Sequence, residues 1–239
     1  MKKALIYIAA FTLTVTSCKR DEAVPGMETI KEVESIATQN SNDDAAIAKY
    51  LEDHYLDAQG NIKAFSTSST ADDNMPKLSS LNPQKLASGV IVIKREGAQP
   101  DPGTTIGTTD IIHLMTKTVG YLSNEEKGVI SFVSEAPLLN TVETTGVPEV
   151  DPQFYYVKQS TLDASKKPRS YYEIEGFQEG LKHFKAFNKE KSEPYNMQGI
   201  IIVPSRAAFA RDEHNAYGMI GWRNRSFVFN FQVYKSIPR

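Results

Sequence analysis

The sequence SYYEIEGFQEGLKHF, residues 170–184, places a glycine and an aromatic residue at the start of an amphipathic pattern. Gly176 stands directly before Phe177, and Leu181 and Phe184 follow at the spacing of one helix face. We therefore predict a short helix in this segment, with an aromatic ring at the beginning of its apolar face.

Strand patterns flank this helix on both sides. The clearest is SFVFNFQVYK, residues 226–235, in which alternate side chains fall on two faces. One face carries Phe227, Phe229, Phe231 and Val233, and the other carries Val228, Asn230, Gln232 and Tyr234. Further short apolar or β-branched runs cover residues 89–97, 109–122, 128–134, 153–160 and 197–205. One helix inserted late among antiparallel-looking strands predicts a one-domain α+β fold with the helix on one face of the sheet.

The N-terminus has the pattern of a cleaved secretory signal. Lys2 and Lys3 precede an apolar stretch over residues 4–15, which is shorter than the roughly 20 residues that a membrane-spanning helix needs. We predict a signal peptide over residues 1–17, which leaves the mature chain with a formal charge of -4 instead of -2. No basic stripe is visible, so we expect no nucleic-acid partner.

Cys18, the only cysteine, follows in the sequence VTSC, which resembles the lipobox of bacterial lipoproteins. The resemblance implies that Cys18 is the first mature residue, is lipidated and attaches the chain to the membrane. A free or buried cysteine is the alternative. The charged KRDE that follows looks like the export signals of some surface lipoproteins, so we expect an outer-membrane lipoprotein on the periplasmic side or at the cell surface.

A tether, a helix and a linker precede the main body. Residues 18–40 are polar and predict a disordered tether. Residues 41–87 predict a helical lead-in and a linker, with Ser41 or Asn42 as the helix cap and Asp43 and Asp44 at the positive end of the helix dipole. The apolar stripe of this helix consists of Ile47, Tyr50, Leu51, His54 and Tyr55. The main domain is expected over residues 88–239, with a long loop over residues 135–153.

No arrangement for nucleophilic, acid–base or metal chemistry is visible. The four histidines, His54, His113, His183 and His214, are scattered and form no HExxH motif. Glu173 and Glu175 share one side of an extended segment, which a solvated face explains. We expect neither catalytic carboxylates nor a metal or cofactor.

The order and spacing of several segments resemble the FKBP-type peptidyl-prolyl isomerases. In that family a glycine precedes an aromatic residue and a helix, a strand ends in Ile-Pro-Ser, and the last strand carries an aromatic residue near its start. The matching residues here are Ile174, Gly176, Phe177, Gly180, Pro204, Ser205, Ala208, Phe209, Ala210 and Phe229. The resemblance covers residues 42–235 and implies an FKBP-like antiparallel sheet wrapped on one short helix, with an N-terminal helical extension.

The resemblance also implies a site for proline-containing polypeptides of the cell envelope. The substrate-binding residues would be Phe132, Ile174, Phe177, Phe209, Ile220 and Phe229. Phe177 would form the floor, Gly176 would let the chain turn sharply before it, and the Ile174 N–H would bind the substrate carbonyl. No nucleophile is needed, because an apolar hollow that binds the twisted X-Pro bond best lowers a barrier of about 18–20 kcal/mol. We therefore expect rings that enclose a dry hollow open to solvent.

Three polar residues of the family pattern are replaced, so the isomerase activity that the resemblance implies is weak. Leu114 or Met115 stands for a tyrosine, Val133 for an aspartate and Phe209 for a second tyrosine. The alternative is a non-catalytic FKBP-like lipoprotein that binds peptides or acts as a chaperone.

A third reading is a surface protein that displays the loop 135–153. The aromatic residues available for such contacts, or for covering the sheet, are Tyr155, Tyr156, Tyr171, Tyr172 and Trp222.

Overall fold

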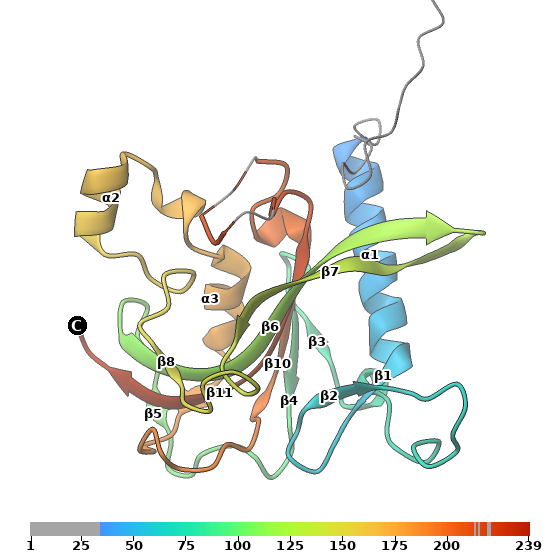
Figure 1. Cartoon of the computed structure of the whole chain (residues 1–239), viewed down its shortest axis with the longest axis horizontal. Coiled ribbons are helices and arrows are strands. Elements are labelled where there is room, and N and C mark those ends of the chain that lie inside the picture. The colour runs from blue at the N-terminus through green and yellow to red at the C-terminus, as the bar shows by residue number, and fades with distance from the viewer. Residues whose placement is uncertain (1–33, 213, 215, 219–220) are drawn as a thin grey trace, which may run out of the picture. The chain divides into compact units, whose positions relative to one another are not determined.

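Strand β11 (Ser226–Ile237) lies inside the main sheet and is buried on both faces over most of its length (Figure 1). Phe227, Phe229 and Phe231 face one layer of the core, and Val228 faces the other. The alternation predicted from the sequence is therefore confirmed.

The computed structural model describes residues 34–212, 214, 216–218 and 221–239. Residues Ser35–Arg239 form one compact unit. The predictions for the signal peptide, for Cys18 and for Ile220 lie outside the described residues. None of the described helices is long and apolar enough to cross a membrane.

The structure contains helices and short helical turns together with eleven strands in the described residues. The helices are α1 (Ile36–Asp53), η1 (Leu78–Ser80), α2 (Gln159–Ser165), η2 (Arg169–Tyr171), α3 (Glu175–Leu181) and η3 (Ser205–Ala207). The strands before the main hairpin are β1 (His54–Leu56), β2 (Ile62–Ala64), β3 (Gln84–Lys85), β4 (Ile91–Lys94) and β5 (Thr104–Thr105). The remaining strands are β6 (Ile111–Glu126), β7 (Val129–Asn140), β8 (Glu149–Val150), β9 (Lys185–Ala186), β10 (Gly199–Val203) and β11.

The main sheet has the order β3-β4-β10-β11-β6-β7, and β8 pairs with β6. Every strand pair in it is antiparallel. Helix α3 packs on one face through Phe177 and Leu181, and helix α1 packs on the other through Ile47 and Leu51. The predicted α+β class is confirmed: an antiparallel sheet carries one short helix on one face and an N-terminal helix on the other.

Helix α1 begins earlier than the sequence pattern predicts. Ser35 is its N-cap and accepts a hydrogen bond from the Thr38 N–H at 3.0 Å, so residues 36–40 are helical and are not part of a disordered tether. Ser41 and Asn42 lie inside the helix, so neither is its N-cap. The helix ends at Asp53, so His54 and Tyr55 belong to β1.

Asp43 does not sit at the helix start but is fully buried in the interface between α1 and the sheet. Its Oδ2 accepts hydrogen bonds from the Ser205 N–H at 3.1 Å and the Ser205 hydroxyl at 2.5 Å. Its Oδ1 accepts from the Gln39 amide at 2.8 Å and the Ser123 hydroxyl at 3.0 Å. This carboxylate therefore anchors α1 to η3 and to β6.

Two strand and loop predictions are wrong. Residues 153–160 form turns and the first residues of α2 rather than a strand. The expected loop 135–153 is shorter, because β7 continues to Asn140 and β8 pairs with β6.

The prediction that Glu173 lies on a solvated face is wrong. Glu173 is buried, accepts the Val157 N–H at 2.8 Å and forms an ion pair with Arg169.

Candidate functional site

The start of α3 is the place where the sequence predicts a binding site, and Gly176 fixes its position there. A Cβ atom at Gly176 would lie 2.5 Å from the Val203 Cγ1 and 2.8 Å from the Ala207 carbonyl oxygen. Gly176 has no left-handed φ, so the expected sharp turn is not its role. The glycine is needed because α3 packs directly against β10 and η3.

Four of the predicted site residues, Ile174, Phe177, Phe209 and Phe229, do come together in one buried cluster. The Phe177 and Phe229 rings stack with their centroids 4.2 Å apart. Phe154 closes this stack, with its ring 5.6 Å from Phe177 and 5.7 Å from Phe229. Phe177 and Phe229 are 0% exposed, so Phe154 fills the space in which the sequence predicts an open hollow.

The backbone donor expected to bind a substrate is also occupied. The Ile174 N–H donates to the Phe154 carbonyl oxygen at 2.8 Å. Phe154 therefore takes both places that the resemblance reserves for a prolyl substrate: its ring packs over Phe177 and its carbonyl accepts from Ile174.

The segment that carries Phe154 is held on both sides. The Gln178 amide donates to the Tyr155 carbonyl oxygen, and the Tyr155 hydroxyl donates to the Gly107 carbonyl oxygen. Two residues further on, the Val157 N–H donates to the Glu173 carboxylate. Because these bonds reach two separate parts of the chain, Gly107 and residues 173–178, Phe154 is fixed in the cluster.

A second segment covers the same cluster from the side of η3. The His214 ring stacks on Phe209 with centroids 3.7 Å apart, and its Nε2 contacts the Tyr171 carbonyl oxygen. The Tyr217 hydroxyl donates to the Tyr172 carbonyl oxygen. These contacts join His214 and Tyr217 to residues 171–172 beside Phe209.

Acidification is expected to weaken this cover. Burial lowers the pKa of His214 from 6.5 to about 4, and its Nδ1 has no hydrogen-bond partner among the described residues. The unfolded chain therefore binds a proton first as the pH falls, so stability is lost between about pH 6.5 and about pH 4. The difference in pKa corresponds to at most about 3–4 kcal/mol, and screening by solvent near the ring reduces the expected loss to about 2 kcal/mol.

Urea unfolding as a function of pH measures this loss. The His214→Gln variant should lose the part of the pH dependence that lies between about pH 6.5 and pH 4. An unchanged pH profile in that variant would rule out His214 as the titrating group.

The remaining predicted site residues do not join the cluster. Phe132 lies on the opposite face of the sheet, where its ring stacks on Tyr121 at 5.1 Å and packs 5.7 Å from Tyr50. It is therefore no wall of the predicted pocket. Leu114, one of the two candidates for the position where the resemblance expects a tyrosine, is fully buried in the same cluster as Phe177 and offers no polar group.

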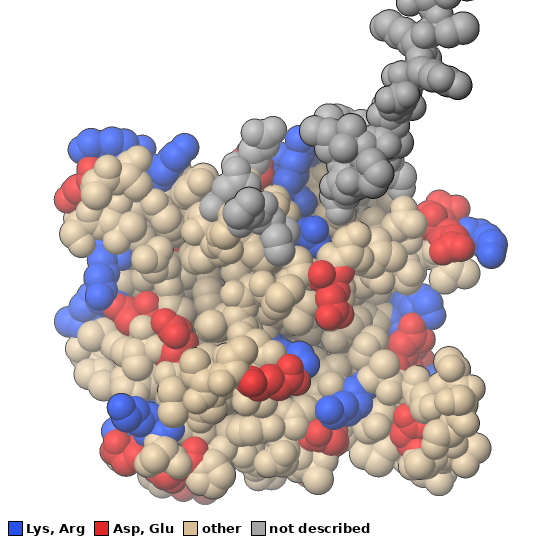
Figure 2. Space-filling view, viewed as in Figure 1, with Lys and Arg blue, Asp and Glu red and all other residues tan. Residues whose placement is uncertain are grey.

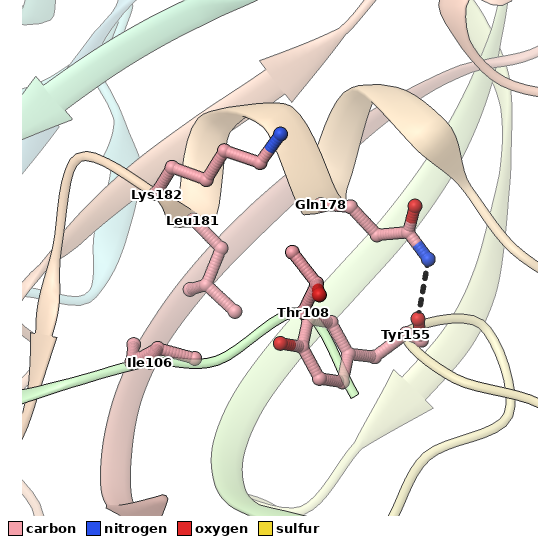
Figure 3. Close-up of a pocket in the computed structure, with 6 residues that line it drawn as sticks. All are labelled: Ile106, Thr108, Tyr155, Gln178, Leu181 and Lys182. Atoms are coloured by element: carbon pink, nitrogen blue, oxygen red, sulfur yellow. Dashed lines mark hydrogen bonds between the residues drawn. The ribbon is translucent and has the colours of Figure 1, made fainter. Parts of the chain in front are cut away.

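A small cavity of about 60 Å³ lies beside the cluster, between the loop before β6 and α3. Figure 3 shows its lining residues, with the Gln178 side chain reaching the Tyr155 carbonyl oxygen. The volume is far below the roughly 300 Å³ of a typical small-molecule pocket. It has room for a few water molecules.

Charge and metal ligands add no further site on the visible face. Figure 2 shows basic and acidic side chains interspersed on it, with no extended patch of one sign. Within the described ranges no three His, Cys, Asp or Glu side chains lie close enough to bind a metal ion.

No protein-family model matches this chain, and no curated protein matches it either. Several solved structures are similar to it, among them the following two. FkpA from Escherichia coli matches with 18% identity and a TM-score of 0.34, over 65% of this chain and 52% of that one. A peptidyl-prolyl cis-trans isomerase from Pseudomonas syringae pv. tomato matches with 10% identity and a TM-score of 0.40, over 87% and 99%. The chain thus matches about half the length of FkpA, and neither likeness is strong enough to assign a function.

Proposed function

We propose that this chain is an FKBP-like module of the cell envelope that binds polypeptides without catalysing prolyl isomerisation. The observation that carries the proposal is the position of Phe154, whose ring covers Phe177 and whose carbonyl accepts the Ile174 N–H. An isomerase of this type needs an apolar hollow that binds the twisted bond more tightly than the planar one. Here the chain itself fills that hollow.

The polar side of the site supports the same function. The three family positions that orient substrate carry Leu114, Val133 and Phe209, none of which has a hydroxyl or carboxyl group. Each missing oriented hydrogen bond costs about 0.5–1.5 kcal/mol. The Ile174 amide is also occupied, so among the described residues none of these four positions offers an oriented group to a substrate carbonyl.

The envelope location rests on the sequence pattern at the N-terminus. The Lys2–Lys3 pair, the short apolar stretch and Cys18 form the arrangement of a lipoprotein signal. Attachment through Cys18 would place the module where exported, unfolded polypeptides pass. Mass spectrometry of the membrane fraction, with Cys18→Ser as the comparison, tests the lipid attachment.

An X-Pro exchange assay tests the absence of catalysis. Uncatalysed exchange takes about 10–100 s at 25 °C. We expect the full chain to leave the exchange rate of a series of X-Pro peptides unchanged, while it retains a permanently unfolded polypeptide such as reduced carboxymethylated α-lactalbumin in a size-exclusion experiment.

Two results would overturn the proposal. Acceleration of exchange that disappears in Phe177→Ala would show that the cluster opens and that the chain is an isomerase. Failure to retain any unfolded polypeptide would leave the binding function without support.

A further inference from the structure

A second cavity lies on the other face of the sheet, away from Phe177. It has a volume of about 180 Å³ and lies between the end of α1, strand β2 and the faces of β6 and β11. Val119 and Val228 form an apolar part of its lining. Its size fits one long side chain rather than a whole small-molecule ligand, for which roughly 300 Å³ is typical.

Strand β2 presents a free backbone edge to this cavity. The β1–β2 register and the bonds that continue it place the Ile62 and Ala64 backbone groups on the side that faces away from β1. The Ile62 N–H donates to the Asn230 Oδ1 at 3.2 Å, which fixes this edge above the sheet. Among the described residues, the Ala64 N–H and the Ile62 and Ala64 carbonyl oxygens have no partner. Such an edge is a template for another extended chain.

A β-bulge directs an acidic side chain into the same cavity. Gly120 pairs with Ala136 and Leu122 pairs with Val133, so two residues of β7 face Tyr121. Ser134, the first of the two, has a φ of 50°, and Glu135, the second, lines the cavity. Bulges of this kind re-aim a side chain and are frequent next to functional sites.

Arg225 holds the bulge in place from the face of the sheet that carries Phe227. Arg225 is buried, and its guanidinium donates to the carbonyl oxygens of Ser134 and Gly120. These bonds therefore fix the bulge of β7 that carries Glu135.

The charge of Glu135 is not balanced within the described part of the chain. Lys117 also lines the cavity, but its charge is already neutralised by an ion pair with Glu143 at 2.7 Å. No ion pair joins Glu135 to any described lysine or arginine.

Two tyrosines complete the polar side of the cavity. Burial raises the pKa of Tyr121 to about 12 and holds the pKa of Tyr50 well above its usual range, with nearby Glu135 adding to both effects. Both hydroxyls therefore stay protonated and neutral. The cavity thus combines one uncompensated carboxylate with neutral hydroxyl groups and aromatic rings, which suits a cation.

We propose that an extended polypeptide segment adds to the free edge of β2 and places a lysine or arginine side chain in this cavity, against Glu135. The backbone of the segment pairs with the Ile62 carbonyl oxygen and with the N–H and carbonyl oxygen of Ala64, and its basic side chain forms an ion pair with the Glu135 carboxylate. This inference rests on the proposed polypeptide-binding function and names the site and the sequence preference of that binding.

Fluorescence anisotropy with a defined probe tests the site. The probe is a capped, fluorescein-labelled nine-residue peptide of alternating serine and threonine with one central lysine, compared with the same peptide carrying norleucine at the centre. For the full chain, Glu135→Gln should weaken binding of the lysine peptide by about threefold to fivefold, because Glu135 is exposed and solvent screens an ion pair there. Binding of the norleucine peptide should be unchanged in this variant.

A second variant tests the backbone pairing. Ala64→Pro removes the outward amide of β2 without breaking a bond to β1. It should therefore weaken the binding of both peptides by about fivefold or more. Glu126→Gln is the matched control, because Glu126 is an exposed residue at the tip of the same hairpin. This variant should bind both peptides as the unaltered chain does.

The outcomes separate this inference from the proposed function. If unfolded α-lactalbumin is retained but neither Glu135→Gln nor Ala64→Pro weakens peptide binding, the site proposed here is wrong and binding occurs elsewhere. If the two peptides bind equally to the unaltered chain, the preference for a basic residue is wrong. If no polypeptide binds at all, the proposed function fails together with the site.

Discussion

The Phe229→Ala variant is expected to lose about 4 kcal/mol of the free energy of unfolding, as for large-to-small changes in a close-packed core. Phe229 is 0% exposed, stacks on Phe177 and packs 5.7 Å from Phe154. Because these rings fill one another's space, removing one leaves a cavity that the others cannot close. Urea unfolding followed by circular dichroism measures the loss.

The size of this loss distinguishes a filled core from an open pocket. If the rings lined a solvent-filled hollow, truncation of Phe229 would cost little stability and would act on binding alone. Phe65→Ala is the control, because Phe65 is only half-buried and packs 5.0 Å from Tyr55. It should cost about 1 kcal/mol, typical of a change away from the core. A loss at Phe229 as small as that at Phe65 would contradict the closed cluster.

The Asp43→Ala variant is expected to lose about 3 kcal/mol, because it leaves buried donors without an acceptor. The carboxylate of Asp43 is fully buried and accepts four hydrogen bonds, two of them from the N–H and hydroxyl of Ser205. Its removal should also loosen α1, which amide hydrogen exchange in residues 36–53 would detect as faster exchange.

A neighbouring carboxylate supplies the comparison for this variant. Asp44 is partly exposed and forms ion pairs with Arg206 at 2.7 Å and Lys85 at 3.1 Å. Asp44→Asn should cost less than about 1 kcal/mol, as surface ion pairs usually do. Equal losses for the two variants would show that Asp43 contributes as a surface charge does and does not anchor the helix.

The sequence pattern predicts the elements whose periodicity reflects burial. The alternation of residues 226–235 and the apolar run before Pro204 correspond to β11 and β10, and Phe177 and Leu181 lie on the buried face of α3. The sequence places the start of α1 too late because Ser41 and Asn42 are residue types that favour the cap position, and only the structure shows that Ser35 accepts the Thr38 N–H.

The site is less predictable because its decisive residue has no local signal. Phe154 and Tyr155 belong to an apolar run that fits a strand as well as a turn whose side chains fill the core. The packing of Phe154 on Phe177 depends on contacts with residues twenty or more positions away in the sequence. Glu135 is equally hidden, since only the bulge at Ser134 turns it toward the cavity on the α1 side.

The order of strands in the main sheet has a consequence for synthesis on the ribosome. Strands β10 and β11 join β4 to β6, yet both come later in the chain than every other strand of that sheet. A nascent chain that has not yet reached Gly199 can form the β6–β7 hairpin but cannot connect it to β4. Its apolar strand edges remain unpaired, so translation products that stop short of β11 should aggregate instead of folding.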